Sequence, residues 1–562
     1  MKDRYPQDST IPTVWLVSPD RQPDYAPVEV PEVTDRSTTA DALADRHVRA
    51  GRGSAVAAIH AETGRSYSFA ELAARSDALA RGLVTAGLRV GDRVAFRTPN
   101  DPEFLVVILA IWKAGGVVVP VPVHARGGEF RHFLADSAAR FLFVHERSGD
   151  LADIAELAQG TTVERIFGFG TDGSATPFEP LEALLASQDA ALPALSADHV
   201  AILWHTGGTT GRPKGCYHTH RRFLLGGYLL GRVTGADFGD RWAAAAPVGH
   251  ALGFIYHTIY TLLNGATAVF IEAFHDPDVL LRAIASHRIT TFTALTASWA
   301  RMAERLREGG PYDTASLIRC YAMWQSASSS EIYDFWRARG VELLNNFGST
   351  AFGTWILVPH PGDAPPRASL GRPLPGYRVE AVDLTGGHVR PVPTGTIGRM
   401  AVKGPTGLTY WNLPDRQASD VLDGWTLSDD LLMFDTEGNA HYLGRSDFMI
   451  STAGFKVAPV EVEEVLSRHP AVREVAVVPA PCPIRQQQVA AYVALRPGHT
   501  GDAALTEALQ AFVRAALSSY KVPRLVSYID ALPRDPVGKV RTREVRDWAE
   551  RDAAGTARNG QS

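Results

Sequence analysis

Helical patterns alternate with short β-branched runs over most of this chain, and this alternation restricts the fold more than any other feature. Ser68 and Glu71 form a capping box at the start of one helical pattern, and Gly87 can end it in the left-handed conformation. Strand-like runs and helical patterns then follow in turn, at 93–97, 101–113, 117–119, 141–144, 266–271, 276–286 and 289–293. Because helices that alternate with buried strands pack on parallel sheets, the sequence predicts a large N-terminal α/β domain of layered sheets and helices.

The chain is too long for a single hydrophobic core. Its 562 residues, of which 45% are hydrophobic, predict more than one domain. The order helix 459–468, strand 472–479, strand 489–495, helix 503–517 and strand 525–529 predicts a small α+β C-terminal domain. We expect an extended or partly disordered N-terminal arm over residues 1–33, the large domain over 34–445, the small domain over 446–551 and a frayed tail over 552–562.

Composition argues against several classes of partner. The formal charge of -5, with Lys and Arg scattered along the chain, leaves no basic stripe for nucleic acid. The sequence has no apolar stretch of the kind that secretion or membrane insertion needs, so we expect no membrane contact and a cytoplasmic location. Cys216, Cys320 and Cys482 lie far apart without metal-ligand spacing, which is typical of small buried hydrophobic residues.

Residues 206–215 read TGGTTGRPKG and directly follow the apolar run 201–204. Glycines bring backbone N–H groups close to an anion, hydroxyls add donors, and a lysine adds a mobile positive charge. The candidate phosphate ligands are Thr206, Gly207, Gly208, Thr209, Thr210 and Lys214. Arg212 and Pro213 separate Gly211 from Lys214, which distinguishes this loop from the Walker type.

The loop resembles the signature loop of the adenylate-forming superfamily, which contains acyl-CoA synthetases, adenylation domains and luciferases. The resemblance continues in order through PVGHALGF (247–254), NNFGST (345–350), GWTLSDD (424–430), GRSDFMISTAGFKVAPVEVEE (444–464) and PRDPVGKV (533–540). Over 398–495 the chain is most similar to benzoate and aminobenzoate CoA ligases. The resemblance implies that ATP and a carboxylic acid give an acyl adenylate and pyrophosphate, and that CoA then displaces AMP. It also implies a mobile small domain that turns about a hinge at Asp447.

The resemblance further implies roles for individual residues. Lys539 is expected to be the catalytic lysine that bridges the carboxylate and the α-phosphate. The nucleotide would be bound by Phe347, Gly348, Ser349, Thr350, Asp430 and Arg445, with the Phe347 ring stacked on adenine and Asp430 on the ribose hydroxyls. CoA would pass Gly454, Phe455 and Lys456, although Lys456 can equally be a solvated lysine.

The acyl pocket is expected around His250, Ala251, Leu252, Gly253, Phe254 and Trp324. We prefer a steric and hydrogen-bonding role for His250 over a general-base role, because a carboxylic acid is already deprotonated at neutral pH. No Arg or Lys is obviously placed for a second substrate carboxylate, which favours a hydrophobic monoacid. We expect an aromatic or bulky cyclic acid, and the sequence leaves benzoate-like, long aliphatic and large polycyclic acids open.

Two segments depart from the family pattern. Ala351 stands where relatives carry a glutamate that helps to hold magnesium, so we expect Mg²⁺ to arrive bound to ATP and to be helped by Thr206 and water. The segment 322–330, AMWQSASSS, replaces a glycine-rich turn, and its Trp324 can either reshape the acyl pocket or pack in the core.

Three questions stay open at the level of sequence. A carrier protein is an alternative acceptor to CoA, and a catalytically silent nucleotide-binding protein is an alternative from another class. The residues also leave the oligomeric state open, a homodimer included.

Overall fold

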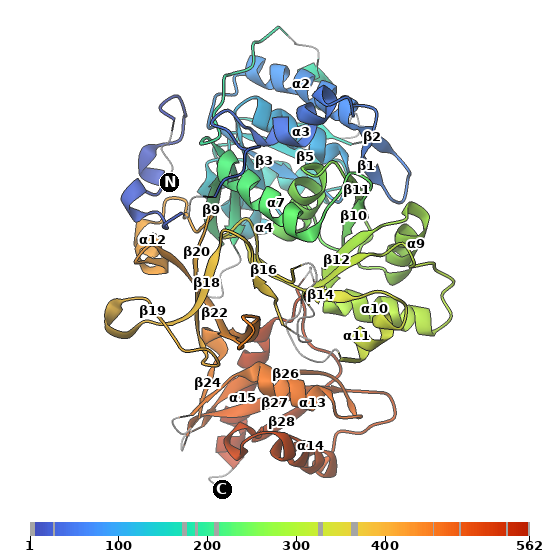
Figure 1. Ribbon diagram of the computed structural model, residues 1–562, viewed down its shortest axis with the longest axis vertical. Coiled ribbons are helices and arrows are strands. Elements are labelled where there is room, and N and C mark those ends of the chain that lie inside the picture. Colours follow the sequence, from blue (N-terminus) through green and yellow to red (C-terminus); the bar gives the residue numbers. More distant parts are fainter. Residues whose placement is uncertain are drawn as a thin grey trace.

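The computed structural model describes residues 6–25, 28–170, 177–185, 189–206, 213–323, 330–360, 363, 369–452, 455–482, 485–535 and 538–559. A large N-terminal part carries the blue to yellow elements of Figure 1, and a smaller C-terminal part, in orange and red, lies below it. The predicted fold class, a large α/β domain with a small C-terminal domain, is thereby confirmed.

The first large sheet has seven strands in the order β7-β6-β5-β3-β4-β8-β9. These are β3 (Arg93–Arg97), β4 (Val117–Pro120), β5 (Phe141–His145), β6 (Arg165–Phe169), β7 (Glu179–Pro180), β8 (Val200–Thr206) and β9 (Lys214–Thr219). All pairs are parallel except the β8–β9 hairpin. The helices that accompany it are α2 (Phe69–Thr85), α3 (Glu103–Lys113), α4 (Gly127–Ser137), α5 (Leu151–Ala158) and α6 (Leu181–Leu185).

Local sequence signals explain why these elements begin and end where they do. The predicted capping box at Ser68 and Glu71 is present at the start of α2, and Gly87 follows its end with φ +92°. Every residue of α3 is buried, because the helix is apolar on all sides and lies inside the layered core.

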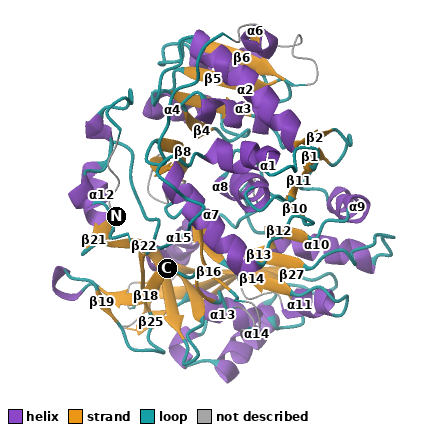
Figure 2. Cartoon of the chain, turned by 45° about the horizontal axis from the view of Figure 1, so that its top comes forward, coloured by secondary structure: helices purple, strands orange, loops and turns teal. Residues whose placement is uncertain are grey.

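The second large sheet has the order β14-β13-β12-β10-β11-β1-β2, with only β2 antiparallel. Its strands are β1 (Val56–His60), β2 (Ser66–Ser68), β10 (Arg241–Ala244), β11 (Thr267–Phe270), β12 (Thr291–Leu295), β13 (Arg319–Met323) and β14 (Leu343–Asn345). The accompanying helical segments are η3 (Asp41–Asp45), α1 (Arg46–Arg49), α7 (His220–Thr234), α8 (Ala251–Ile255), η5 (Tyr256–Tyr260), α9 (Pro277–His287), α10 (Thr296–Arg307) and α11 (Ser330–Arg337). Figure 2 shows helices packed around the strands of this part.

Antiparallel strands connect the large part to the small one. A three-stranded sheet contains β15 (Phe347–Ser349), β16 (Thr354–Val358) and β17 (Arg372–Pro373). A six-stranded sheet contains β18 (Arg378–Asp383), β19 (Arg390–Pro391), β20 (Gly398–Lys403), β21 (Val421–Leu422), β22 (Trp425–Phe434) and β23 (Ala440–Arg445), with η6 (Thr385–Gly387) and α12 (Pro414–Asp420) between them. The last strand, β23, leads directly into η7 (Ser446–Phe448), which contains Asp447.

The small part is a five-stranded sheet with a hydrophobic cluster on each face. Its elements are β24 (Ile450–Thr452), β25 (Phe455–Val457), α13 (Pro459–Ser467), β26 (Val472–Cys482), β27 (Gln486–Leu495), α14 (Ala503–Ala516), η8 (Ser519–Lys521), β28 (Leu525–Ile529) and α15 (Thr542–Asn559). The predicted order of helices and strands is present. The tail expected from Asp552 begins within α15, which continues to Asn559, and the Tyr492 hydroxyl donates to Asp552 at 2.7 Å.

The described residues of the expected N-terminal arm lie against the large part. The arm contains the short helical turns η1 (Thr13–Trp15) and η2 (Pro19–Arg21), and it buries Ile11, Leu16 and Val17. The Val17 N–H donates to the Tyr217 hydroxyl at 2.9 Å, so apolar burial and a backbone hydrogen bond both hold the arm on the large part. Among the described helices, none combines the length and the apolar character that crossing a bilayer requires.

Candidate active site

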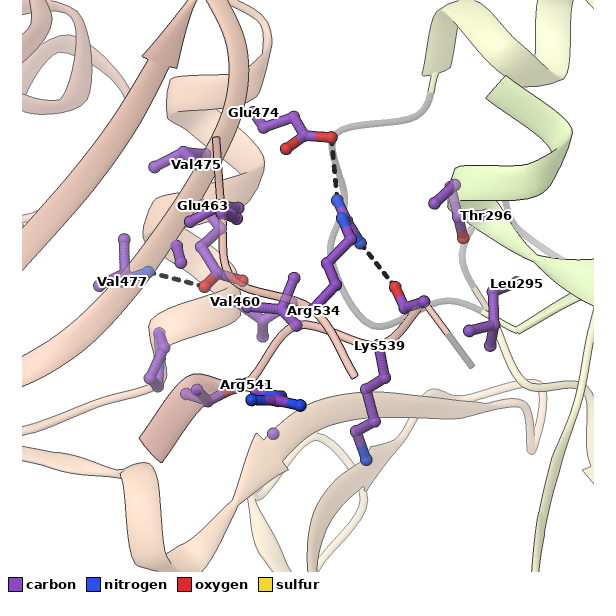
Figure 3. A pocket seen from close by; sticks show the side chains of 18 of the residues that line it. Leu295, Thr296, Val460, Glu463, Glu474, Val475, Val477, Arg534, Lys539 and Arg541 are labelled. Carbon is purple, nitrogen blue, oxygen red and sulfur yellow. Dashed lines mark hydrogen bonds and ion pairs between the residues drawn. The ribbon is translucent and has the colours of Figure 1, made fainter. Parts of the chain in front are cut away.

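A cavity of about 700 Å³ lies where the large and small parts meet. The large part contributes Leu295, Thr296 and Ala300, at the end of β12 and on α10, and the small part contributes Val475 and Val477 of β26. Tyr442, Gly444 and Arg445 line it from β23, and Gly538 and Lys539 line it from the turn before α15. Figure 3 shows residues of both parts around this space. Segments that lie hundreds of residues apart in sequence therefore share one site.

A tight turn presents Lys539. Two hydrogen bonds join Asp535 and Lys539. The Asp535 N–H donates to the Lys539 carbonyl, and the Lys539 N–H donates to the Asp535 carboxylate, both at 2.8 Å. Gly538 has φ +91°, a conformation that other residues adopt only under strain. Arg534 donates to the Gly538 carbonyl at 2.8 Å and to Glu474 of β26 at 2.9 Å (Figure 3). The turn is thus held both internally and by the sheet of the small part.

Lys539 is exposed, and charged groups of both parts act on its ammonium. Desolvation by the surrounding protein lowers the pKa of its ammonium, Asp430 opposes this shift, and Arg445 adds to it. Lys539 therefore lies within electrostatic reach of Asp430 and Arg445. The structure brings together the expected catalytic lysine and the two expected ribose residues.

Asp430 is buried on β22, and both of its oxygens accept hydrogen bonds. Ser428 donates to one oxygen, and the Tyr442 hydroxyl donates to the other at 3.2 Å. Asp430 and Arg445 are partners across the β22–β23 ladder, which fixes their spacing. Because its carboxylate is already oriented, Asp430 can accept ribose hydroxyls through its remaining lone pairs with little reorganisation.

Arg445 is directed by a neighbouring carboxylate. Its Nη2 donates to Asp429 at 3.1 Å and lies 3.9 Å from the Asp447 carboxylate. Its Nε is buried and makes no hydrogen bond among the described residues. Arg445 therefore keeps a donor that a bound polar ligand could use.

Phe347 begins β15, where it is half-buried, and its ring centroid lies 6.2 Å from that of Tyr442. Gly348 is required next to it, because a Cβ there would lie 2.6 Å from the Thr354 carbonyl oxygen. Ser349 pairs with Thr354, and the Thr350 carbonyl accepts from His218 at 2.8 Å. The segment thus presents an aromatic ring on a fixed backbone.

His250 is the N-cap of α8, and its Nδ1 accepts from Leu252 N–H at 3.4 Å. Desolvation lowers the pKa of the imidazole, Asp535 opposes the shift, and Lys539 and His124 add to it. His250 is therefore neutral at pH 7 and lies within electrostatic reach of Lys539. A neutral imidazole fits the expected steric and hydrogen-bonding role, which stays a prediction.

Two residues of the expected acyl pocket pack elsewhere. Phe254 is fully buried and contacts the rings of Phe96, Phe104 and Trp204, because its side chain points into the main core. A Cβ on Gly253 would lie 2.3 Å from the Pro247 carbonyl oxygen, so the missing side chain lets the backbone at Gly253 pack closely against the backbone at Pro247. Ala251 and Leu252 are half-buried at the start of α8.

Several expected site residues lie outside the described residues. These are Gly207, Gly208, Thr209, Thr210, Trp324 and Gly454, together with the side chain of Lys456. The described ends of the phosphate loop, Thr206 and Lys214, are partners in the β8–β9 hairpin, and the Thr206 hydroxyl donates to the Lys214 carbonyl at 3.4 Å. Phe455 is 54% exposed, stacks on Tyr520 and does not line the cavity.

Sequence reasoning missed Tyr442 and Glu463, which both line the cavity. Glu463 on α13 accepts from Val477 N–H at 2.8 Å, and burial raises the pKa of its carboxyl to about 7. The run VEVEE contains three glutamates on one helix, and nothing in their spacing tells which of them faces the large part. Ala351 is half-buried against the core, and among the described residues no group of His, Cys, Asp or Glu is arranged to hold a metal ion.

Comparison with known proteins identifies the family to which the chain is similar. A model of the AMP-binding enzyme family matches residues 45–411, and a model of the AMP-binding enzyme C-terminal domain matches residues 461–539. The chain is 31% identical to the benzoate–CoA ligase of Thauera aromatica, over 92% of this chain and 97% of that one. It is also 31% identical to a feruloyl-CoA synthase of an Amycolatopsis species, over 89% and 97%.

Among solved structures, the anthranilate CoA ligase AuaEII in complex with anthranoyl-AMP superimposes with a TM-score of 0.84 at 25% identity, over 94% of this chain and 100% of that one. The ordered motifs, the shared fold and the match over most of the chain agree. The chain therefore belongs to the AMP-binding enzyme family, the adenylate-forming superfamily that its motifs resemble.

Proposed function

We propose that this enzyme is an AMP-forming acyl-CoA ligase that activates a hydrophobic, aromatic or bulky cyclic carboxylic acid. The observation that carries the proposal is that Lys539 and Arg445 line one cavity between the two parts, and that Asp430 is the partner of Arg445 across the β22–β23 ladder. The aromatic acids in the names of the benzoate, feruloyl and anthranilate enzymes support the substrate class.

In the first step, a carboxylate oxygen of the acid attacks the α-phosphorus of ATP, and the bond to pyrophosphate breaks. Negative charge then gathers on oxygens that are already anionic. The ammonium of Lys539 can stabilise this charge, since it is held by a rigid turn and needs little rearrangement. In the second step, the CoA sulfur attacks the acyl carbon as its thiolate, and AMP leaves.

We also propose that the boundary between the two domains lies at Arg445 and Ser446, and that the small domain turns about Asp447 between the steps. In the described conformation Lys539 lines the same cavity as Arg445, and we assign this conformation to adenylate formation. Gly454 and Lys456 would approach the acyl group only after rotation.

Magnesium is part of this proposal only as the ion that ATP carries. Ala351 offers no carboxylate, and the described residues hold no suitable cluster of ligands, so no step is assigned to a protein-bound metal.

Exchange of labelled pyrophosphate into ATP tests the first step directly. We expect exchange that depends on benzoate or anthranilate and exceeds the exchange with a short aliphatic acid such as acetate. If none of a panel of aromatic, aliphatic and polycyclic carboxylates supports exchange, the catalytically silent alternative is favoured. Exchange without thioester formation when CoA is added would favour a carrier protein as the acceptor.

A further inference from the structure

Helix α4 contacts both described ends of the expected phosphate loop. His132 and Asp136 are four residues apart on α4, so their side chains lie on one face of the helix. His132 contacts Pro213, the residue before Lys214, and Asp136 contacts His205, the residue before Thr206. The two contacts therefore reach the residues directly before the two described candidate phosphate ligands, at the Pro213 carbonyl and at the His205 side chain.

The hydrogen-bond directions in this cluster are fixed by chemistry. His132 Nε2 lies 2.7 Å from the Pro213 carbonyl oxygen, which can only accept, so the His132 Nε2 carries the proton. His205 Nε2 lies 2.9 Å from Asp136 Oδ2, and the His205 side chain is fully buried. The His205 ring also packs edge-on against Phe133, with 4.9 Å between ring centroids.

The far end of α4 is fixed to the same hairpin by Trp411. Trp411 Nε1 donates to the Asp136 carbonyl at 3.0 Å, and the Trp411 N–H donates to the Gly215 carbonyl at 2.9 Å. A Cβ on Gly215 would lie 2.8 Å from the Cβ of Trp411 and 3.3 Å from Asp136 Oδ2. The hairpin, the helix and Trp411 are therefore in close contact.

We propose that His132, Asp136 and His205 are positioning residues that hold Thr206 and Lys214 in place for the β- and γ-phosphates of ATP. We name these three residues the loop clamp. This inference rests on the proposed function, because it takes Thr206 and Lys214 as phosphate ligands. The clamp touches no substrate, so its effect should be confined to ligands that carry the two outer phosphates.

Binding of ATP and of AMP to the full chain, measured by calorimetry without acid or CoA, tests the clamp. His132→Leu removes the donor to Pro213, and we expect about a fivefold rise in the Kd for ATP, the effect of losing about one hydrogen bond. The Kd for AMP should stay within about twofold, because AMP lacks the outer phosphates. His132→Gln keeps an N–H donor and should restore ATP binding.

Asp136 provides an independent pair of variants. Asp136→Asn keeps an acceptor for His205 and should bind ATP like the wild type, whereas Asp136→Leu should weaken ATP binding and leave AMP binding intact. Arg131→Gln is the matched control, because Arg131 lies on the same helix and donates to the Gln159 carbonyl, away from the loop.

Each outcome is decisive. Unchanged ATP binding in both leucine variants, an equal loss of AMP binding, or a failure of His132→Gln to restore ATP binding would overturn the clamp while leaving the proposed function intact. If the wild-type chain instead binds ATP no more tightly than AMP, the loop does not bind the outer phosphates, and the clamp is overturned with it.

Discussion

Lys539, His250 and Asp430 are each positioned by a different local feature. Lys539 is presented by a turn that needs a glycine at 538, His250 caps a short helix, and Asp430 is oriented by Ser428 and Tyr442. Each of these features is made by the chain itself, so the fold positions the charged groups that we propose for adenylate formation.

Lys539→Ala should separate the two half-reactions. Because the ammonium is expected to stabilise the charge on the α-phosphate only during adenylate formation, we predict a loss of at least about 100-fold in pyrophosphate exchange. Conversion of supplied benzoyl-AMP and CoA to benzoyl-CoA should be retained. The control is Lys403→Ala, since Lys403 pairs with Asp24 away from the site. Equal loss of both half-reactions in Lys539→Ala would contradict the assigned role.

At the scale of elements, the sequence predicted most helices and strands, because their signals are local. The capping box of α2, the proline in the first turn of α9 and the order of elements after the hinge are all present. The contacts of Val17 with Tyr217 and of Asp552 with Tyr492 could not be predicted, since each joins residues far apart in sequence. Phe254 was misplaced for a similar reason: its motif does not reveal which way the ring points.

The hinge element gives the second prediction. Asp447→Pro fixes φ at about -65° at the expected pivot and should restrict rotation of the small domain. We expect pyrophosphate exchange to be retained and thioester formation from benzoyl-AMP to be lost. Asp447→Ala is the matched control, because it removes the weak contact with Arg445 and leaves the backbone free. If Asp447→Pro keeps both half-reactions, rotation about this residue is not required.

Helix α13 gives the third prediction, through Glu463. Burial raises the pKa of this carboxyl from 4.5 to about 7, and the Val477 N–H opposes the shift. The folded chain then binds more protons than the unfolded chain between these two values. The stability that Glu463 contributes is therefore fully present below about pH 4.5 and is lost as pH rises through about 7.

Glu463→Gln should remove this dependence. We expect the Tm of the wild type, measured relative to that of Glu463→Gln, to fall as pH rises from about 5 to about 8. The control is Glu464→Gln, whose carboxylate pairs with Arg468 at 2.6 Å on an exposed part of α13. If the Tm difference between the wild type and Glu463→Gln does not change with pH, burial of Glu463 is not the cause. The same holds if the Tm difference between the wild type and Glu464→Gln falls equally.

At the scale of the whole molecule, the ordered motifs predicted the family and the two-part organisation, because each motif has a fixed place along the chain. The cavity between the parts could not be predicted in the same way. It depends on how α13 and β26 meet β12, α10 and β23, and these elements are far apart in sequence. Tyr442 and Glu463 were missed for this reason.

If the enzyme joins an aromatic acid to CoA through an adenylate, the products of the complete reaction must show it. We would analyse by mass spectrometry a reaction that contains the enzyme, benzoate, ATP, magnesium and CoA. We expect benzoyl-CoA and AMP in equal amounts, no ADP, and no thioester when Lys539→Ala replaces the wild type. Thioester formation with ADP, or AMP and benzoyl-CoA at wild-type rates from Lys539→Ala, would contradict this mechanism.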